Sequence, residues 1–532
     1  MFLTNQVSAP EVRDMFEGAV ALGLPDARRF AKAGNFGKAK KHIKRDMLRQ
    51  SLKGKKDWPP LYFIDVEIMN PATQTIGLKK LPLILPHEFV FFLAKKNVDA
   101  CLLSEEGMAQ CTRRHLDAAR RELKVGSLLA IGLWGDGVPC KFDRSESLEC
   151  LTMNLPGPIA AKDMRVPVTV INKNMLVKSI TWDNVYTVLA WSFSVLASGC
   201  MPVIDHLGNP MTGARAKWAG KPLMKGVLAE FRGDWCWYKS CFRFPQHNEK
   251  LGICWRCNVT PVTMREVGLS ASWRGSTLNH WQLLERMAKQ GLPPSPLFGC
   301  PAFRSTAVLI DWLHVADQGI LLHLLASVFK YIMKKLPGST DVEQCRNLWL
   351  EMQTFYRSNP VDSKLDNLTL SMLGAKSKPP KLRARAAEAR NLVPFVLALV
   401  QKYLSHNNDL ESTMIHCTTY LSKCYANLSV ASFSAASLKD ASRKFCTLYV
   451  TLERMFNDKR LWHVTPKLHL FQELCEECAT CPSLSWVYRD EDMGGSLMGL
   501  GRRRGGANNV TTTACAVLYR FIANNRMPAL AA

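Results

Sequence analysis

Three acidic residues stand where carboxylates could bind metal ions. Asp136 follows the apolar run SLLAIGLWG, Asp234 follows GVLAEFRG, and Glu491 lies in WVYRDEDMGG before a predicted helix. Carboxylates at the carboxyl ends of strands project into the crevice where α/β sheets bind ligands. Three that converge there would offer oxygen ligands to Mg²⁺ or Mn²⁺, and two such ions about 3.5–4 Å apart support phosphodiester cleavage. The alternative is that each is a turn residue or a helix cap.

A second group of residues has the spacing of zinc ligands. Cys254 and Cys257 are separated by two residues, which is typical of one half of a tetrahedral zinc site. His463 and His469 have five residues between them, and Glu473 follows closely. The alternative is a pair of buried thiols and a surface imidazole, and the spacing leaves both interpretations open.

The composition is that of a globular and strongly basic chain. Its 532 residues are 47% hydrophobic and 21% charged, which excludes a mostly disordered chain and corresponds to about three to four domain lengths. Lys and Arg number 69 and Asp and Glu 45, a net charge of +24, so we expect a polyanion as the first candidate partner and an anionic membrane surface as the second. Eighteen cysteines without regular spacing, and an N-terminus without a signal-peptide pattern, predict a nuclear or cytoplasmic protein that is not secreted.

The longest uncharged apolar stretch runs from Asn184 to Ile204. It contains three serines and Pro202 and begins beside Asp183. We therefore interpret it as a buried helix that leads into a loop, capped by Thr181 or Asp183, and expect no membrane span.

The pattern along the chain predicts four parts. Residues 1–125 form a basic N-terminal region, mostly helical with a short β segment. Residues 126–265 contain apolar runs that end in polar turns, in the order strand, strand, strand, helix, strand. Residues 266–460 have helical periodicity, with a capping box expected at Thr340, and residues 461–532 close the fold with the last acidic residue and a C-terminal helix.

Basic residues gather in two places whose role the sequence leaves open. Between Arg28 and Lys56 twelve Lys and Arg residues crowd one stretch, and Arg502 to Arg504 follow Glu491. Such runs are either solvated faces or localisation signals, or they contact the DNA backbone.

Taken together, the segments resemble the catalytic core of DDE transposases of the CACTA (En/Spm) type and their KDZ-like relatives, in the RNase H-like superfamily. The similar blocks occur in the family's order over roughly residues 125–500. They are GDGVP followed by MNLPG, RGDWCWYKSCF followed by GICWRC, IDWLHVADQGI, and PKLHLFQEL followed by SLSWVYRDED. Trp486 stands five residues before Glu491, as in the family's closing block.

The resemblance implies an α/β fold, with an RNase H-like mixed sheet and flanking helices interrupted by a large all-α insertion. It implies metal-dependent DNA strand cleavage and strand transfer by Asp136, Asp234 and Glu491, with Mg²⁺ or Mn²⁺ as cofactor and a homo-oligomer on DNA. A more distant similarity to the V(D)J recombinase catalytic subunit favours a structural Zn²⁺ held by Cys254, Cys257 and His469, with His463 or Glu473 as the fourth ligand.

The chain also departs from the family pattern. Arg489 and Asp490 replace a Pro-Phe pair, and Asp490 and Asp492 flank Glu491, so that any of the three could be the closing acid. Four glycines, at 494, 495, 499 and 501, weaken the following helix. These departures leave open a decayed or domesticated copy, either a catalytically inactive nucleic-acid-binding protein or a zinc-stabilised interaction protein. For His314, we favour a packed or capped histidine over a functional contact.

Overall fold

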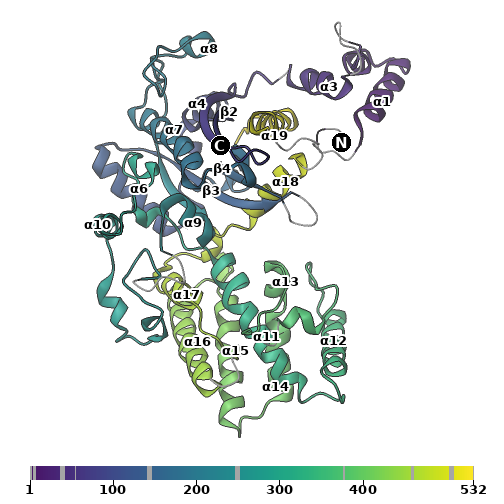
Figure 1. Ribbon diagram of the computed structural model, residues 1–532, viewed down its shortest axis with the longest axis vertical. Coiled ribbons are helices and arrows are strands. Elements are labelled where there is room, and N and C mark those ends of the chain that lie inside the picture. Colours follow the sequence, from purple (N-terminus) through teal and green to yellow (C-terminus); the bar gives the residue numbers. More distant parts are fainter. Residues whose placement is uncertain are drawn as a thin grey trace.

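A four-stranded sheet lies at the centre of the upper part of the protein (Figure 1). The computed structural model describes residues 3, 7–35, 42–53, 55–140, 146–245, 252–374, 378–456, 461–501 and 509–530. The strands are β3 (Leu129–Pro139), β4 (Ser147–Asn154), β5 (Val166–Asn172) and β6 (Gly226–Gly233). Their order is β5-β4-β3-β6, with β4 antiparallel to both neighbours and β6 parallel to β3. The predicted mixed α/β class and the four predicted strands are confirmed.

The strand register brings the two predicted aspartates together. Gly135 on β3 is paired with Gly233 on β6. Asp136 and Asp234 therefore follow at matching positions on neighbouring parallel strands, which lie about 4.8 Å apart in any sheet. A bridge between Phe231 and Val308 adds one further parallel pairing beside β6.

Helices cover both faces of this sheet. On one face Gly135 leaves room for Trp237 of α9 (Trp235–Phe242), whose ring packs edge-on against Trp182 of α7 (Lys178–Ser198). On the other face, Trp134 and Val138 contact α18 (Tyr488–Gly501). Because side chains alternate along a strand, Asp136 points to the same face as Trp134 and Val138 and thus toward α18.

The glycines of α18 serve its packing. A Cβ on Gly494 would lie 2.9 Å from Val138 Cγ2 and 3.0 Å from Trp134, and one on Gly501 would lie 2.8 Å from Leu148. Helix α18 continues through all four glycines. The sequence predicted only that they weaken the helix, whereas the glycines at 494 and 501 also permit close packing. Gly494 allows the helix to approach β3, which carries Asp136, and Gly501 allows it to approach β4.

The predicted cap of helix α7 is wrong. The helix begins at Lys178 without a side-chain cap; the hydroxyl of Thr181 accepts from the backbone N–H of Val177 and donates to the carbonyl of Glu67. Helix α10 (His280–Lys289) is capped by Asn279. The predicted buried helix that leads into a loop is confirmed in α7.

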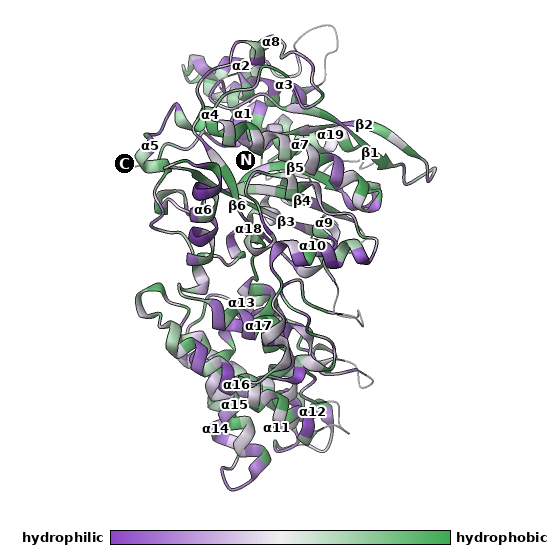
Figure 2. Cartoon of the chain, turned by 90° about the vertical axis from the view of Figure 1, so that its left-hand side faces the viewer, coloured by the Kyte–Doolittle hydropathy of each residue, from purple (hydrophilic) through white to green (hydrophobic). Residues whose placement is uncertain are grey.

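The lower part of the protein is helical, as predicted for residues 266–460. After α10 it contains α11 (Leu321–Met333), α12 (Asp341–Ser358), α13 (Ala386–Asn391), α14 (Val393–Tyr403), α15 (Asp409–Ala426), α16 (Ala435–Met455) and α17 (Pro466–Glu477). Figure 2 shows α11 to α16 below the strands. The capping box of Thr340 and Glu343 is confirmed. The stretch Leu313–Met333 is long and apolar enough to cross a membrane. However, 78% of an apolar 18-residue segment within it is buried inside the protein, as in the core helix of a globular fold.

The N-terminal region contains helices and a hairpin. Its helices are α1 (Ala9–Ala21), α2 (Arg28–Ala31), α3 (Ile43–Leu52), α4 (Pro86–Ala94), α5 (Asp99–Leu102) and α6 (Gln110–Leu123). The hairpin is formed by β1 (Tyr62–Met69) and β2 (Ile76–Leu83), which accounts for the predicted β segment. Helix α19 (Val510–Asn524) is the predicted C-terminal helix. Lys38, Lys40, Lys41 and Arg502 to Arg504 lie outside the described residues.

Glu476 joins α17 to two other segments. Its carboxylate accepts hydrogen bonds from Arg274 (2.7 Å) and Arg443 of α16 (3.0 Å). Although burial opposes ionisation, these guanidinium groups lower the pKa of Glu476 to about 2. The contacts of Glu476 with the two arginines therefore stabilise the fold at pH values above the ordinary pKa of a glutamate.

This contact predicts a pH-dependent contribution to stability. Glu476→Gln should lower the free energy of unfolding at pH 7 by on the order of 2 kcal/mol. Because the folded pKa is depressed, the difference should persist down to about pH 4.5 and vanish as the pH falls toward 2. Urea titrations of both proteins from pH 7 to pH 3 measure this, with the more exposed Glu477→Gln as control. A difference that does not change over this range would contradict the assignment.

Candidate functional site

Two predicted acidic residues and one histidine form a tight group at the edge of the sheet. Asp136 of β3, Glu491 in the first turn of α18, and His314 of the π-helical segment Leu313–Ile320 each bring a ligand atom within 4.8 Å of the others. The three side chains are partly accessible to solvent. The group thus combines the oxygen and nitrogen donors that a divalent cation binds.

Asp234 lies beside this group without belonging to its tightest part. It is the N-cap of α9, and its Oδ1 accepts a hydrogen bond of 2.5 Å from the backbone N–H of Trp237. Its charge still reaches Asp136, since after burial it is the main influence that raises the pKa of Asp136. The other carboxylate oxygen of Asp234 has no hydrogen-bond partner within the described part of the chain.

The carboxylates repel one another in the metal-free protein. Burial, followed by the charge of Asp136, raises the pKa of Glu491 to about 8. Glu491 consequently keeps its proton near neutral pH and shares it with Asp136. A bound cation would remove this repulsion, so the residues present fit a divalent metal.

His314, for which the sequence favours a packed or capped histidine, is largely buried and hydrogen-bonded, and it also lies in this group of possible ligands. Its Nδ1 lies 2.8 Å from Asp311 Oδ2, and its Nε2 lies 3.5 Å from Glu491 Oε1. Although burial opposes its charge, the hydrogen bond and charge of Asp311, then Glu491, raise the pKa of His314 to about 9. The signal in the sequence was the Asp311-x-x-His314 spacing within IDWLHVADQGI.

Asp311 positions both His314 and α18. Its Oδ2 accepts the backbone N–H of His314 at 2.9 Å, while its Oδ1 accepts the backbone N–H of Val487 at 3.1 Å. One buried carboxylate therefore holds the histidine ring and the start of the helix that carries Glu491.

A second buried aspartate links the same helix to the helical part. Asp317 accepts hydrogen bonds from the hydroxyls of Tyr425 on α15 (2.6 Å) and Tyr488 on α18 (2.7 Å). Burial raises the pKa of Asp317 to about 7. The position of Glu491 is thus tied to the helices that interrupt the α/β part.

The surroundings of the three consecutive acids identify Glu491 as the one that faces the site. Asp490 is fully buried and pairs with Arg165 and with Arg232 Nη1, at 3.5 Å from the latter. Asp492 is exposed. Of these three acids only Glu491 lies in the group with Asp136. The geometry therefore favours Glu491 among the three candidates for the closing acid.

Asp490 is expected to be a stability residue. Asp490→Asn removes the charged partner of Arg165 and one of the two partners of Arg232, which also pairs with Glu230; breaking a buried pair costs about 3 kcal/mol or more. Chemical denaturation should show this loss, whereas Asp492→Asn should change the free energy of unfolding by less than about 0.5 kcal/mol. Equal stability of the two variants would contradict the buried pairing.

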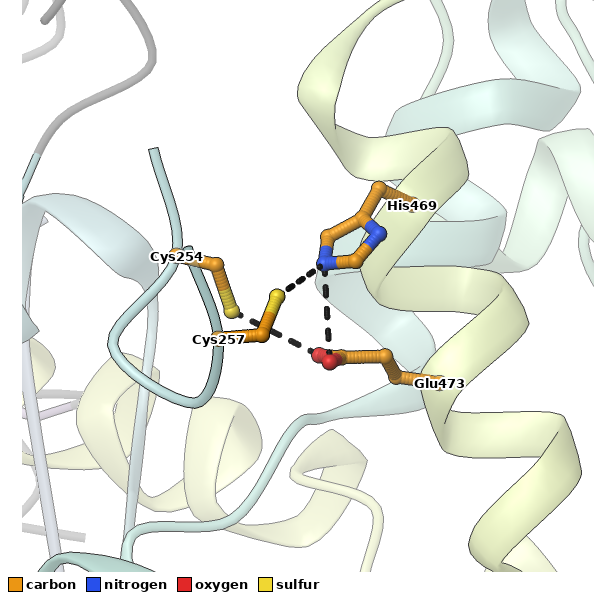
Figure 3. A group of neighbouring side chains, drawn as sticks. All are labelled: Cys254, Cys257, His469 and Glu473. Carbon is orange, nitrogen blue, oxygen red and sulfur yellow. Dashed lines mark hydrogen bonds and ion pairs between the residues drawn. The ribbon is translucent and has the colours of Figure 1, made fainter. Parts of the chain in front are cut away.

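The predicted zinc ligands form a second, fully buried group (Figure 3). Cys254 and Cys257 come from a short loop after α9, and His469 and Glu473 lie one turn apart on α17. Cys257 Sγ lies 3.4 Å from His469 Nε2, Cys254 Sγ lies 3.5 Å from Glu473 Oε2, and His469 Nε2 lies 3.5 Å from Glu473 Oε1.

These separations fit a tetrahedral ion. Donor atoms about 2.0–2.3 Å from a tetrahedral zinc lie roughly 3.3–3.8 Å from one another. Thiolates, imidazoles and carboxylates are each known zinc ligands. Arg286 of α10 supports the loop by donating to the backbone carbonyls of Cys254 (2.8 Å) and Cys257 (3.3 Å).

His463 is not the fourth member of this group, and Glu473 takes that place. The ring of His463 is half exposed and lies 3.8 Å from Glu453 of α16. His463 precedes α17, whereas Glu473 is one helical turn beyond His469 and so shares its face.

The comparisons with known proteins give no family assignment. No protein-family model matches the chain, and no curated protein matches it. Function is therefore inferred from the geometry of the two groups and from the resemblance of the sequence blocks to DDE transposases.

Proposed function

We propose that the protein is a transposase-like enzyme, or a domesticated descendant of one, which cleaves and transfers DNA strands with divalent metal ions. The observation that carries the proposal is the convergence of Asp136 and Glu491, more than 350 positions apart, beside Asp234 at the edge of one sheet. Carboxylates that are forced together in this way are typical of metal-dependent phosphodiester chemistry.

The topology supports an RNase H-like core. Three antiparallel strands are followed by a fourth that is parallel to the first, with helices on both faces. Asp136 lies on the first of these strands and Asp234 directly after the fourth, as the resemblance to DDE transposases implies. The large helical part between Asp234 and Glu491 also agrees with that resemblance.

In this proposal the carboxylates bind the metal and the histidine stabilises the charge of one of them. Asp136, Asp234 and Glu491 would hold the Mg²⁺ or Mn²⁺ ions. The ions would supply an activated water or 3′-hydroxyl and stabilisation of the leaving oxygen. His314, held in its charged form by Asp311, lies 3.5 Å from Glu491 and would stabilise the negative charge of that carboxylate.

We assign a structural role to the buried group of Cys254, Cys257, His469 and Glu473. Zn²⁺ held there would join the loop that follows α9 to α17, and would thereby fix the helical part against the strand that leads to Asp234. All four donors are buried, so none is left for a substrate, as in closed structural zinc sites.

The charge of the chain supports DNA as the substrate. A net charge of +24 favours a polyanion, and exposed basic residues of the N-terminal helices, among them Arg28, Arg29 and Arg49, offer contacts to phosphates. A nuclear location and a homo-oligomer on DNA belong to the same proposal.

The test is nicking of supercoiled plasmid, and of DNA with terminal repeats, in Mg²⁺ or Mn²⁺. The wild-type protein is expected to nick only with metal, and Asp234→Asn is expected to be inactive. Equal nicking by the two proteins, above background, would remove Asp234 from the mechanism.

A catalytically inactive DNA-binding protein is the second candidate. It is favoured by one observation, that the Asp234 carboxylate caps α9 and lies outside the tightest group. This candidate predicts salt-dependent DNA binding without metal-dependent nicking. A zinc-stabilised interaction protein would instead lose its fold on chelation and bind DNA negligibly.

A further inference from the structure

Lys467, in the first turn of α17, lies beside the segment that carries His314. Its Nζ donates a hydrogen bond of 2.7 Å to the backbone carbonyl of His314, the residue whose ring faces Glu491. The lysine thus approaches the same group of residues from a different part of the chain.

The π-helical segment makes room for this lysine. Gly319 has non-helical backbone angles (φ −102°, ψ −106°), and a Cβ at this position would lie only 2.9 Å from Lys467 Cδ and 3.1 Å from the His314 carbonyl oxygen. Any other residue at 319 would push the lysine stem away. The irregular segment that carries His314 is therefore shaped around Lys467.

The ammonium group has donors to spare. A lysine offers three N–H donors, and the His314 carbonyl is the one hydrogen-bond acceptor that Lys467 reaches in the described residues. No carboxylate lies within ion-pair distance of it in that part of the chain. Burial, followed by the charge of Lys381, lowers the pKa of Lys467 to about 8, although the charges of Asp234 and Asp311 oppose this. A neutral donor such as Gln would satisfy one carbonyl equally well, so a purely structural role does not explain a cation here.

We propose that Lys467 binds a phosphate oxygen of the nucleic-acid strand that enters the acidic site. This inference rests on the proposed function, because the partner is the phosphodiester at Asp136, Asp234 and Glu491. Lys467 lies two residues before His469 on α17, so the buried Cys254–Cys257–His469–Glu473 group also fixes the turn that presents the lysine.

Two readouts test the proposal. The first is the binding of a fluorescein-labelled oligonucleotide in Ca²⁺, measured by anisotropy from 50 to 200 mM KCl. Lys467→Met keeps the aliphatic stem and should weaken binding and reduce the slope of log K against log salt by about one unit, as expected for the loss of one phosphate contact. Lys467→Arg should keep the slope. The control is Lys444→Met on α16, an exposed lysine paired with Asp440, which should behave as wild type.

The second readout is plasmid nicking in Mn²⁺ at saturating DNA, where Lys467→Met should be slower by ~10-fold or more and Lys467→Arg should recover part of the rate. An unchanged salt slope in Lys467→Met, with a lowered Tm alone, would overturn the proposal and leave a structural lysine. If the wild-type protein fails to nick, the proposed function is wrong, yet the binding slope still decides whether Lys467 meets a phosphate.

Discussion

Glu491→Gln is expected to abolish metal-dependent nicking while making the metal-free protein more stable. Loss of one member of a catalytic group lowers the rate by roughly 10³-fold or more. The same change removes an acid that burial and the charge of Asp136 force to keep its proton, so the free energy of unfolding without metal should rise by on the order of 1 kcal/mol. A substitution that lowers activity while it raises stability is expected only where acidic groups are held together for function.

The neighbouring acid provides the control for this experiment. Asp492→Asn removes an exposed carboxylate one residue away and should leave both the nicking rate and the Tm unchanged. If Glu491→Gln lowered the stability of the metal-free protein, or if Asp492→Asn removed activity, the assignment of Glu491 as the closing acid would be wrong.

Purified protein is expected to contain one zinc ion per chain, and Cys257→Ser is expected to lose it together with much of the stability of the fold. A structural zinc site contributes folding free energy directly, so the loss should reach several kcal/mol. Elemental analysis gives the stoichiometry, and thermal unfolding with and without a chelator gives the stability.

Cys300→Ser is the matched control for the zinc experiment, because Cys300 is equally buried but belongs to no cluster of metal-binding residues among those described. It should retain the zinc and lose only the modest free energy of a buried thiol. Protein that is free of zinc when purified without chelator, or a Tm that chelation does not change, would contradict a structural zinc.

The strands and the order of the acidic residues could be predicted from the sequence because their signals are local. Each strand is an apolar run bounded by polar residues, although β3 continues through Asp136 to Pro139 instead of ending at its Gly-Asp pair. Cys254 and Cys257 have the spacing of zinc ligands within one loop. Glu473 could be named only as one of two alternatives, since its contact with Cys254 joins residues 219 positions apart.

What the sequence could not predict depends on packing between distant elements. His314 resembles any helix histidine until Asp311 and Glu491 are seen on either side of it. The choice of Glu491 over Asp490 follows from Arg165 and Arg232, which come from other parts of the chain. The glycines at 494 and 501 lower helix propensity, but close approach to β3 and β4 outweighs that local cost.

The most direct test of the central claim is an anomalous difference map from crystals soaked in MnCl₂. We expect Mn²⁺ within about 2.0–2.3 Å of carboxylate oxygens of Asp136 and Glu491. The Asp234 side chain should turn away from the N-terminus of α9 and bind the same ion or a second one beside it. Crystals that bind Mn²⁺ elsewhere and leave these three carboxylates without metal would contradict it.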